Sequence, residues 1–122
     1  MEKLTRLEEE IMLILWKLEQ AFVKDIIDEM PEPKPHYNTI STMMKLLQEK
    51  QFVSYTAYGK TYQYFPLISK ETYCSAQVKP MLKNYFEGST KNLVSFFVKE
   101  KNISVTELEK LVTELKQRSL KR

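Results

Sequence analysis

Apolar residues recur every three or four positions in the first thirty residues, which is the spacing of helices buried on one side. Between residues 4 and 18 this pattern predicts a helix of about three to four turns, with Trp16 widening its apolar face. Thr5 and Glu8 have the spacing of a capping box and mark the start of this helix. The acidic residues of its first turn, 8–10, are interpreted as a solvated cluster that matches the helix dipole. A second, shorter helix is predicted over 23–30.

Three prolines interrupt the helical pattern, so 31–35 is predicted to be a stiff connector. From His36 to Lys50 helical spacing returns, and the apolar side of this segment carries Tyr37, Ile40, Met43, Met44 and Leu47. The other side carries Asn38, Ser41, Thr42 and Lys45. Asn, Ser and Thr are weak helix formers, and no acid lies between Pro35 and Glu49, so this face suits a phosphate-lined groove. The alternative is a helix start with polar residues of no special function. Two helices joined by a rigid turn have the layout of a helix-turn-helix.

After Lys50 the pattern changes to the two-residue period of a β-strand. Residues 53–58 and 61–65 flank Gly59 and Lys60, which predicts a β-hairpin with Gly59 in the turn. Aromatic, basic and hydroxyl side chains that suit a sugar–phosphate backbone crowd the tip: Tyr58, Lys60, Thr61 and Tyr62. Three helices followed by a hairpin is the order of a winged helix, which also occurs as a protein–protein interaction module.

Beyond the hairpin the spacing becomes helical again. Ser69 is expected to cap a helix that contains Pro80, where we expect a kink or a break. A dense apolar helix follows Ser89, and Ser104 and Glu107 have the spacing of a second capping box. These helices total about 50 residues, which is small for an independent core, so we expect a symmetric dimer through 70–118. The expected dimer residues are Tyr73, Met81, Leu82, Tyr85, Leu93, Phe97, Leu108, Leu111, Val112 and Leu115.

The expected fold class is therefore mostly α with a small β-hairpin. An N-terminal winged helix-turn-helix over 1–68 is expected to bind DNA, and a C-terminal helical lobe over 69–122 is expected to form the dimer.

Charge is distributed unevenly along the 122 residues. The net charge is +3, but residues 1–32 have a balance of −5, residues 33–65 of +3 and residues 69–122 of +5. Local charge would therefore make any nucleic-acid contact. The acidic N-terminus lacks the apolar stretch of a signal peptide, and no apolar run approaches about 18 residues. We expect a cytoplasmic protein without membrane insertion.

Little in the sequence supports catalysis or metal binding. Cys74 is the only cysteine, which excludes an internal disulfide and a multi-cysteine zinc site. His36 is the only histidine, and a structural role or a hydrogen bond to phosphate is favoured over catalysis. No phosphate loop, metal-ligand cluster or nucleophile–base pair is present in the sequence. We expect neither an enzyme nor a cofactor.

Four segments resemble the penicillinase-repressor family of bacterial winged-helix transcription regulators, the BlaI, MecI and CopY types. They are LTRLEEEIMLILW, NTISTMMKLLQEKQFV, the hairpin YGKTYQYFPL and NLVSFFVKE. The resemblance implies a homodimeric repressor on a dyad-symmetric operator, with one recognition helix in the major groove of each half-site. Carried over by position, the recognition-helix contacts fall on Tyr37, Asn38, Thr39, Ser41, Thr42 and Lys45. The wing contacts fall on Tyr58, Gly59, Lys60 and Thr61, and we add His36 and Tyr62 as neighbouring contacts.

The chain departs from the family pattern in three places. Family members often carry an extra basic residue on the recognition helix, where Ser41 and Leu46 stand here. Copper-responsive members use a C-terminal cluster of cysteines, because thiolates hold Cu(I), and this chain has only Cys74. The β-lactam-responsive members are cut at an Asn-Phe bond, and the matching bond, Phe96–Phe97, lacks the asparagine. The family resemblance makes a membrane sensor protease a candidate partner. No metal is expected.

Overall fold

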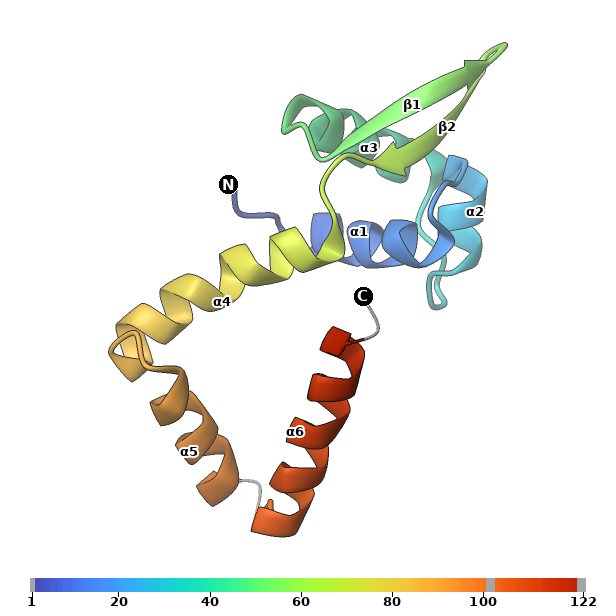
Figure 1. The fold of residues 1–122 in the computed structure, drawn as a ribbon. Coiled ribbons are helices and arrows are strands. Elements are labelled where there is room, and N and C mark those ends of the chain that lie inside the picture. The colour runs from blue at the N-terminus through green and yellow to red at the C-terminus, as the bar shows by residue number, and fades with distance from the viewer. Residues whose placement is uncertain (1, 101–102, 121–122) are drawn as a thin grey trace. The chain divides into compact units, whose positions relative to one another are not determined.

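The computed structural model describes residues 2–100 and 103–120, with side chains described as far as residue 118. The described chain is mostly helical with one antiparallel hairpin (Figure 1). Its elements are α1 (Arg6–Leu18), α2 (Val23–Asp28), α3 (Tyr37–Glu49), β1 (Val53–Tyr58), β2 (Thr61–Pro66), α4 (Lys70–Phe86), α5 (Thr90–Glu100) and α6 (Val105–Leu120). It divides into two compact units, Met1–Ala76 and Gln77–Arg122. The first unit has the order of a winged helix-turn-helix, so the predicted fold class is confirmed.

The capping box predicted at the start of α1 is present. The amide of Glu8 donates to Thr5 Oγ1 at 3.3 Å, and the amide of Thr5 donates to Glu8 Oε1 at 2.8 Å. Two otherwise free amides of the helix start are satisfied in this way. α1 therefore begins at Arg6 and directs Ile11 and Leu15 into the core, where both are fully buried.

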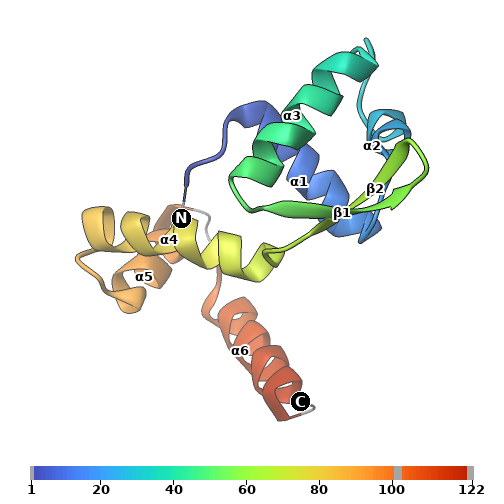
Figure 2. The ribbon, with the colours of Figure 1, turned by 90° about the horizontal axis from the view of Figure 1, so that it is seen from above.

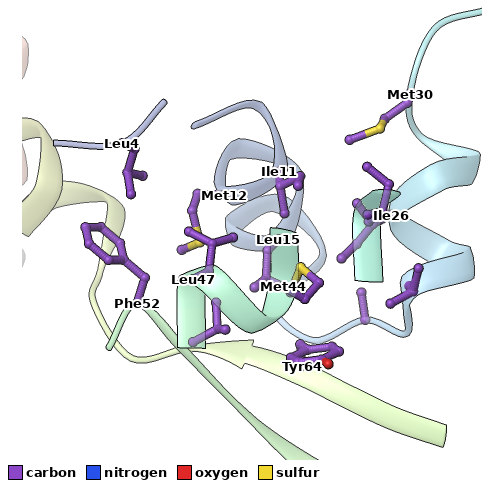
Figure 3. Close-up of a cluster of buried hydrophobic side chains, with 14 of the residues drawn as sticks. Leu4, Ile11, Met12, Leu15, Ile26, Met30, Met44, Leu47, Phe52 and Tyr64 are labelled. Carbon is purple, nitrogen blue, oxygen red and sulfur yellow. The ribbon is translucent and has the colours of Figure 1, made fainter. Parts of the chain in front are cut away.

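The core of the first unit lies between α1, α2 and α3 and is closed by the hairpin (Figures 2 and 3). Figure 3 shows Met44 of α3 and Tyr64 of β2 close together, with Leu15 of α1 beside them. Side chains of three helices and one strand thus share a single apolar interior, whose burial is the main source of the unit's stability. Its buried members are Leu4, Ile11, Met12, Leu15, Ala21, Val23, Ile26, Met30, Ile40, Met44, Leu47, Phe52, Val53, Tyr64 and Tyr73.

α3 is buried along one side only, as its sequence pattern predicts. Ile40, Met44 and Leu47 are fully buried, and Met43 is partly buried. Tyr37 was assigned to the same apolar side, but its side chain is 53% exposed. The reason is its position in the first turn, because the burial of α3 begins only at Ile40. Tyr37 is therefore available at the surface.

The hairpin is present as predicted and has a further partner in the sheet. β1 and β2 pair antiparallel, with Val53 opposite Pro66 and Tyr58 opposite Thr61. Gly59 has a φ of 63°, the left-handed conformation that the predicted turn requires. Ala21, in the link between α1 and α2, exchanges two backbone hydrogen bonds with Tyr64, of 2.9 and 2.8 Å. This bridge fixes β2 against the helices.

The interpretation of the acidic first turn of α1 as solvated is wrong for Glu8. Its side chain is 1% exposed, and its Oε1 accepts a hydrogen bond from Lys50 Nζ at 2.7 Å. Burial raises the pKa of Glu8, but hydrogen bonds from Lys50 and Thr5 outweigh it and hold the pKa below the usual 4.5. Because Lys50 caps the C-terminal end of α3, the pair joins the start of α1 to the end of α3.

The first turns of α4 belong to the first unit. Tyr73 is 6% exposed, with its ring centroid 5.6 Å from that of Trp16 and 5.8 Å from that of Phe52. Its hydroxyl donates to Glu9 Oε2 at 2.9 Å. This packing is consistent with the end of the first unit at Ala76.

The second unit consists of the rest of α4 with α5 and α6. α4 runs through Pro80 without the break that the sequence allowed. Ser89 and Ser104 accept hydrogen bonds from the amides of Asn92 and Glu107, each at 3.1 Å, and so cap α5 and α6. No side chain described between 77 and 118 is buried. Among the described helices, none is both long enough and apolar enough to cross a membrane.

We predict that Lys50→Met lowers the free energy of unfolding by about 3 kcal/mol at neutral pH, because it leaves the buried carboxylate of Glu8 without its cation. In the wild type the contribution of Glu8 is present above pH 4.5 and is lost as the pH falls through its lower folded pKa. In the variant, burial dominates and raises that pKa, so acidification should recover part of the lost stability. Urea unfolding at neutral and acidic pH measures both effects.

Lys17→Met is the matched control for this experiment. Lys17 Nζ lies 3.1 Å from Glu29 Oε2, but the two side chains are 69% and 38% exposed. An exposed pair of this kind contributes about 0–1 kcal/mol. Equal losses of stability in the two variants would contradict the role assigned to Lys50.

Candidate nucleic-acid interface

Apart from Tyr37 and Leu46, the surface of α3 that faces away from the core is polar, and its first three turns carry no acid. Asn38, Thr39, Thr42 and Lys45 are exposed, and Ser41 is half-buried. His36 is the N-cap residue and is exposed, and its side chain does not cap the helix. The burial of Ile40, Met44 and Leu47 directs all of these groups outward. The structure therefore brings every predicted recognition-helix residue, 36–45, onto one helix and its N-cap.

The tip of the hairpin presents aromatic and basic side chains in defined positions. Tyr58 and Tyr62 are 57% and 41% exposed, and Lys60 is exposed between them. The ring of Tyr62 stacks on that of Tyr55, with centroids 4.1 Å apart and planes 19° apart. Thr61 Oγ1 donates to the carbonyl oxygen of Tyr58 at 3.1 Å and closes the turn. The hairpin is therefore an ordered projection beside α3.

A cavity of about 290 Å³, which we call the helix–wing cavity, lies between α3 and the hairpin. Lys45 of α3 and Lys60 of the hairpin turn both line it, although they come from different elements. The full lining is Val23, Tyr37, Ser41, Lys45, Lys60, Tyr62 and Tyr64, and it contains no carboxylate. Burial raises the pKa of Tyr64, and so do its neighbours Tyr37, Tyr55 and Tyr62, so this phenol is neutral at physiological pH.

This arrangement can contact both parts of a DNA duplex. A helix fits the major groove, where short amide and hydroxyl groups form hydrogen bonds with base edges. Lysines beside it can neutralise phosphates, which positions a protein on the duplex without reading sequence. The exposed side of α3 supplies the first kind of group, and Lys45 and Lys60 supply the second.

Two residues of the cavity, Val23 and Tyr64, were not among the candidate site residues. Val23 is 5% exposed and was assigned only to the apolar side of the second helix. Tyr64 reaches the cavity because its backbone pairs with Ala21, a contact across 43 residues that no local pattern signals. Asn38, Thr39 and Thr42 lie on the exposed face but do not line the cavity.

The residues expected to form a dimer differ in exposure. Tyr73 is buried within the first unit, so we leave it out of the dimer surface. The others on α4, α5 and α6 are exposed or half-buried. Phe96 and Phe97, the residues of the candidate cleavage bond, lie inside α5 and are 46% and 43% exposed. Their rings contact each other edge to face at 5.9 Å, and that of Phe96 contacts Phe86 at 5.5 Å.

Comparison with known proteins identifies the family. The family model described as "Penicillinase repressor" matches residues 4–117 of the chain. The chain belongs to the penicillinase repressor family. The resemblance found in the sequence is thereby confirmed, and family membership supports a transcriptional repressor that binds DNA.

Curated relatives of this penicillinase-repressor chain include the methicillin resistance regulatory protein MecI of Staphylococcus aureus strain N315. It is 29% identical over 105 residues, which cover 85% of each chain. The penicillinase repressor of Bacillus licheniformis is 24% identical over 105 residues, which cover 85% of this chain and 82% of the relative. The solved CopR repressor structure is 26% identical, with a TM-score of 0.46, and covers 56% of this chain and 100% of that chain.

The turn of the wing gives a prediction about stability. Gly59→Ala should destabilise the protein by about 1–2 kcal/mol, because a Cβ is unfavourable at a positive φ. Apart from Gly59 itself and the two adjoining residues, nothing lies within 4 Å of the added Cβ, so the cost arises in the backbone alone. Gly59→Asn should cost less, since asparagine adopts this conformation more readily. Thermal unfolding of the two variants measures the difference, and equal losses would contradict the explanation.

Proposed function

We propose that this protein is a homodimeric, sequence-specific repressor that binds a dyad-symmetric DNA operator. Each copy would place Tyr37–Lys45 in the major groove of one half-site and the 58–62 wing on the backbone. The observation that supports this most directly is the acid-free face of α3 beside a cavity that Lys45 and Lys60 share. This function requires no catalytic group and no cofactor.

Different residues of the face would have different tasks. Asn38 and Thr42 are exposed and short, so they suit hydrogen bonds to base edges. Lys45 and Lys60 suit phosphates, and His36 at the N-cap suits a further phosphate contact. The ring centroid of Tyr58 lies 6.0 Å from that of Phe22, in an edge-to-face contact. This contact holds Tyr58 at the hairpin tip, where it would meet the sugar–phosphate backbone.

The second unit would form the dimer. In α6, Leu111, Val112 and Leu115 are 51%, 44% and 53% exposed and recur at the spacing of one helix face. With no buried side chain described in this unit, its apolar groups lack an interior of their own. A second copy of the chain would cover them, and a two-fold dimer would match a palindromic operator.

A cytoplasmic location would place the repressor beside its operator, and a membrane sensor protease remains a candidate partner. Its candidate bond, Phe96–Phe97, lies in the middle of α5. Proteases cleave locally unfolded chain, so α5 would have to open before cleavage. The exposed rings of both residues suit recognition by an apolar site of such an enzyme.

Substitutions in the recognition helix should separate base contacts from phosphate contacts. Asn38→Ala and Thr42→Ala should each cost about 1–3 kcal/mol on a site selected from random DNA, and little on mixed-sequence DNA. Lys45→Ala should weaken binding to both. Dissociation constants on the two duplexes measure these effects, and equal losses for all three variants would contradict the assignment.

The same titrations at several salt concentrations test DNA binding itself. Wild-type binding should weaken steeply as salt rises, because neutralised phosphates release counterions. A salt-independent interaction, or none, would favour a winged helix that serves only as a protein-interaction module.

The dimer proposal is tested in the full-length chain. Leu111→Asp should convert the dimer to a monomer, because it adds a charge to the apolar face of α6. Thr113→Asp is the matched control, since it adds the same charge to the opposite side of the helix. Sedimentation equilibrium gives the mass of each variant. A Leu111→Asp protein that stays dimeric would exclude this face as the dimer surface.

A further inference from the structure

We infer that the helix–wing cavity is a binding site for one DNA backbone phosphate with its deoxyribose, held jointly by Lys45 of α3 and Lys60 of the wing. This rests on the proposed DNA-binding function. It adds that the helix and the wing share one contact instead of making independent ones.

The chemistry of the lining selects an anion. Two lysines and three hydroxyl-bearing residues, Ser41, Tyr37 and Tyr62, are among the residues that line the cavity, and no acidic residue is. Among the residues that the structure describes, neither Lys45 nor Lys60 lies within ion-pair distance of an acid. Two like charges on one small space repel each other, and a phosphodiester between them would replace this repulsion with two attractions.

The aromatic walls indicate what accompanies the phosphate. Tyr62 is held by its stack on Tyr55, and Tyr64 is buried beneath the cavity. The exposed ring of Tyr62, supported in this way, offers apolar surface to a deoxyribose, while its hydroxyl can still donate a hydrogen bond. A volume of about 290 Å³ is about ten times the roughly 30 Å³ that a water molecule occupies, so the cavity has room for a deoxyribose beside the phosphate.

A shared phosphate would couple two parts of the DNA-binding surface. α3 could not move along the groove without withdrawing Lys45 from the phosphate that Lys60 holds. The wing would therefore set the register of the recognition helix, since phosphate contacts position a protein on the duplex. Ser41, half-buried on the cavity wall, would contact this phosphate instead of a base.

The test compares Lys45→Ala, Lys60→Ala and the double variant of the full-length protein on a mixed-sequence duplex. Affinity is measured over a range of salt concentrations. If the two lysines share one phosphate, the slope of log K against log salt should become less negative by about 0.9 in the double variant. This is the value for a single neutralised phosphate. Each single variant should lose less than this, because the remaining lysine still neutralises the phosphate.

A loss of about 1.8 in the double variant would overturn the inference, since it corresponds to two separate phosphates. That result would leave the proposed function intact. Wild-type binding that does not depend on salt would instead overturn the proposed function, and the inference with it.

Lys17→Ala is the control for net charge, because Lys17 is an exposed lysine of the first unit that lines a different cavity, beside Trp16. It should leave the slope unchanged, and a loss as large as that of the double variant would contradict a local site. Lys45 and Lys60 are exposed, so thermal unfolding of the variants should match the wild type and exclude misfolding as the cause.

Discussion

An ion pair between the buried Glu8 and the partly buried Lys50 joins the start of α1 to the end of α3. Glu8 accepts hydrogen bonds from the amide of Thr5 and from Lys50 Nζ, so one carboxylate both caps α1 and holds Lys50, the C-cap residue of α3. Gln51 follows with a φ of 64°, which turns the chain at once and allows Phe52 to enter the core. Because β1 begins directly after Phe52, the position of the hairpin depends on the same contact. The positions of α3 and of the hairpin thus both depend on the buried carboxylate of Glu8.

The hairpin combines a base that is fixed against the core with a tip that is exposed. Tyr64 satisfies the first condition through its two backbone bonds to Ala21 and the burial of its ring. Beyond this point the strands leave the core, and the ring of Tyr62 is held by stacking on Tyr55 and by an edge-to-face contact with Tyr64. The helix–wing cavity lies at this transition, where the last buried residues of the wing face the exposed side of α3.

Local patterns in the sequence were sufficient to predict the helices, the capping box at Thr5 and the hairpin, because each depends on residues within one or two turns. They also gave the exposed side of α3, which is what remains when the apolar positions are removed. They failed where distant segments meet. Three contacts show this: the ion pair of Glu8 with Lys50, the bridge of Ala21 to Tyr64 and the ring contact of Tyr73 with Trp16. Each of them joins residues that lie far apart in the sequence. Helical periodicity shows which face is apolar, but it does not show what covers that face or where the cover ends.

The surroundings of Trp16 have a practical consequence. It is the only tryptophan in the chain, its Nε1 donates to the carbonyl oxygen of Ile68 at 2.8 Å, and its ring contacts that of Tyr73. All three residues belong to the first unit. Its intrinsic fluorescence will therefore report on that unit alone, whereas circular dichroism records the helices of both. A difference between the two signals during unfolding would reveal whether the winged helix and the C-terminal helices lose their structure together or one after the other.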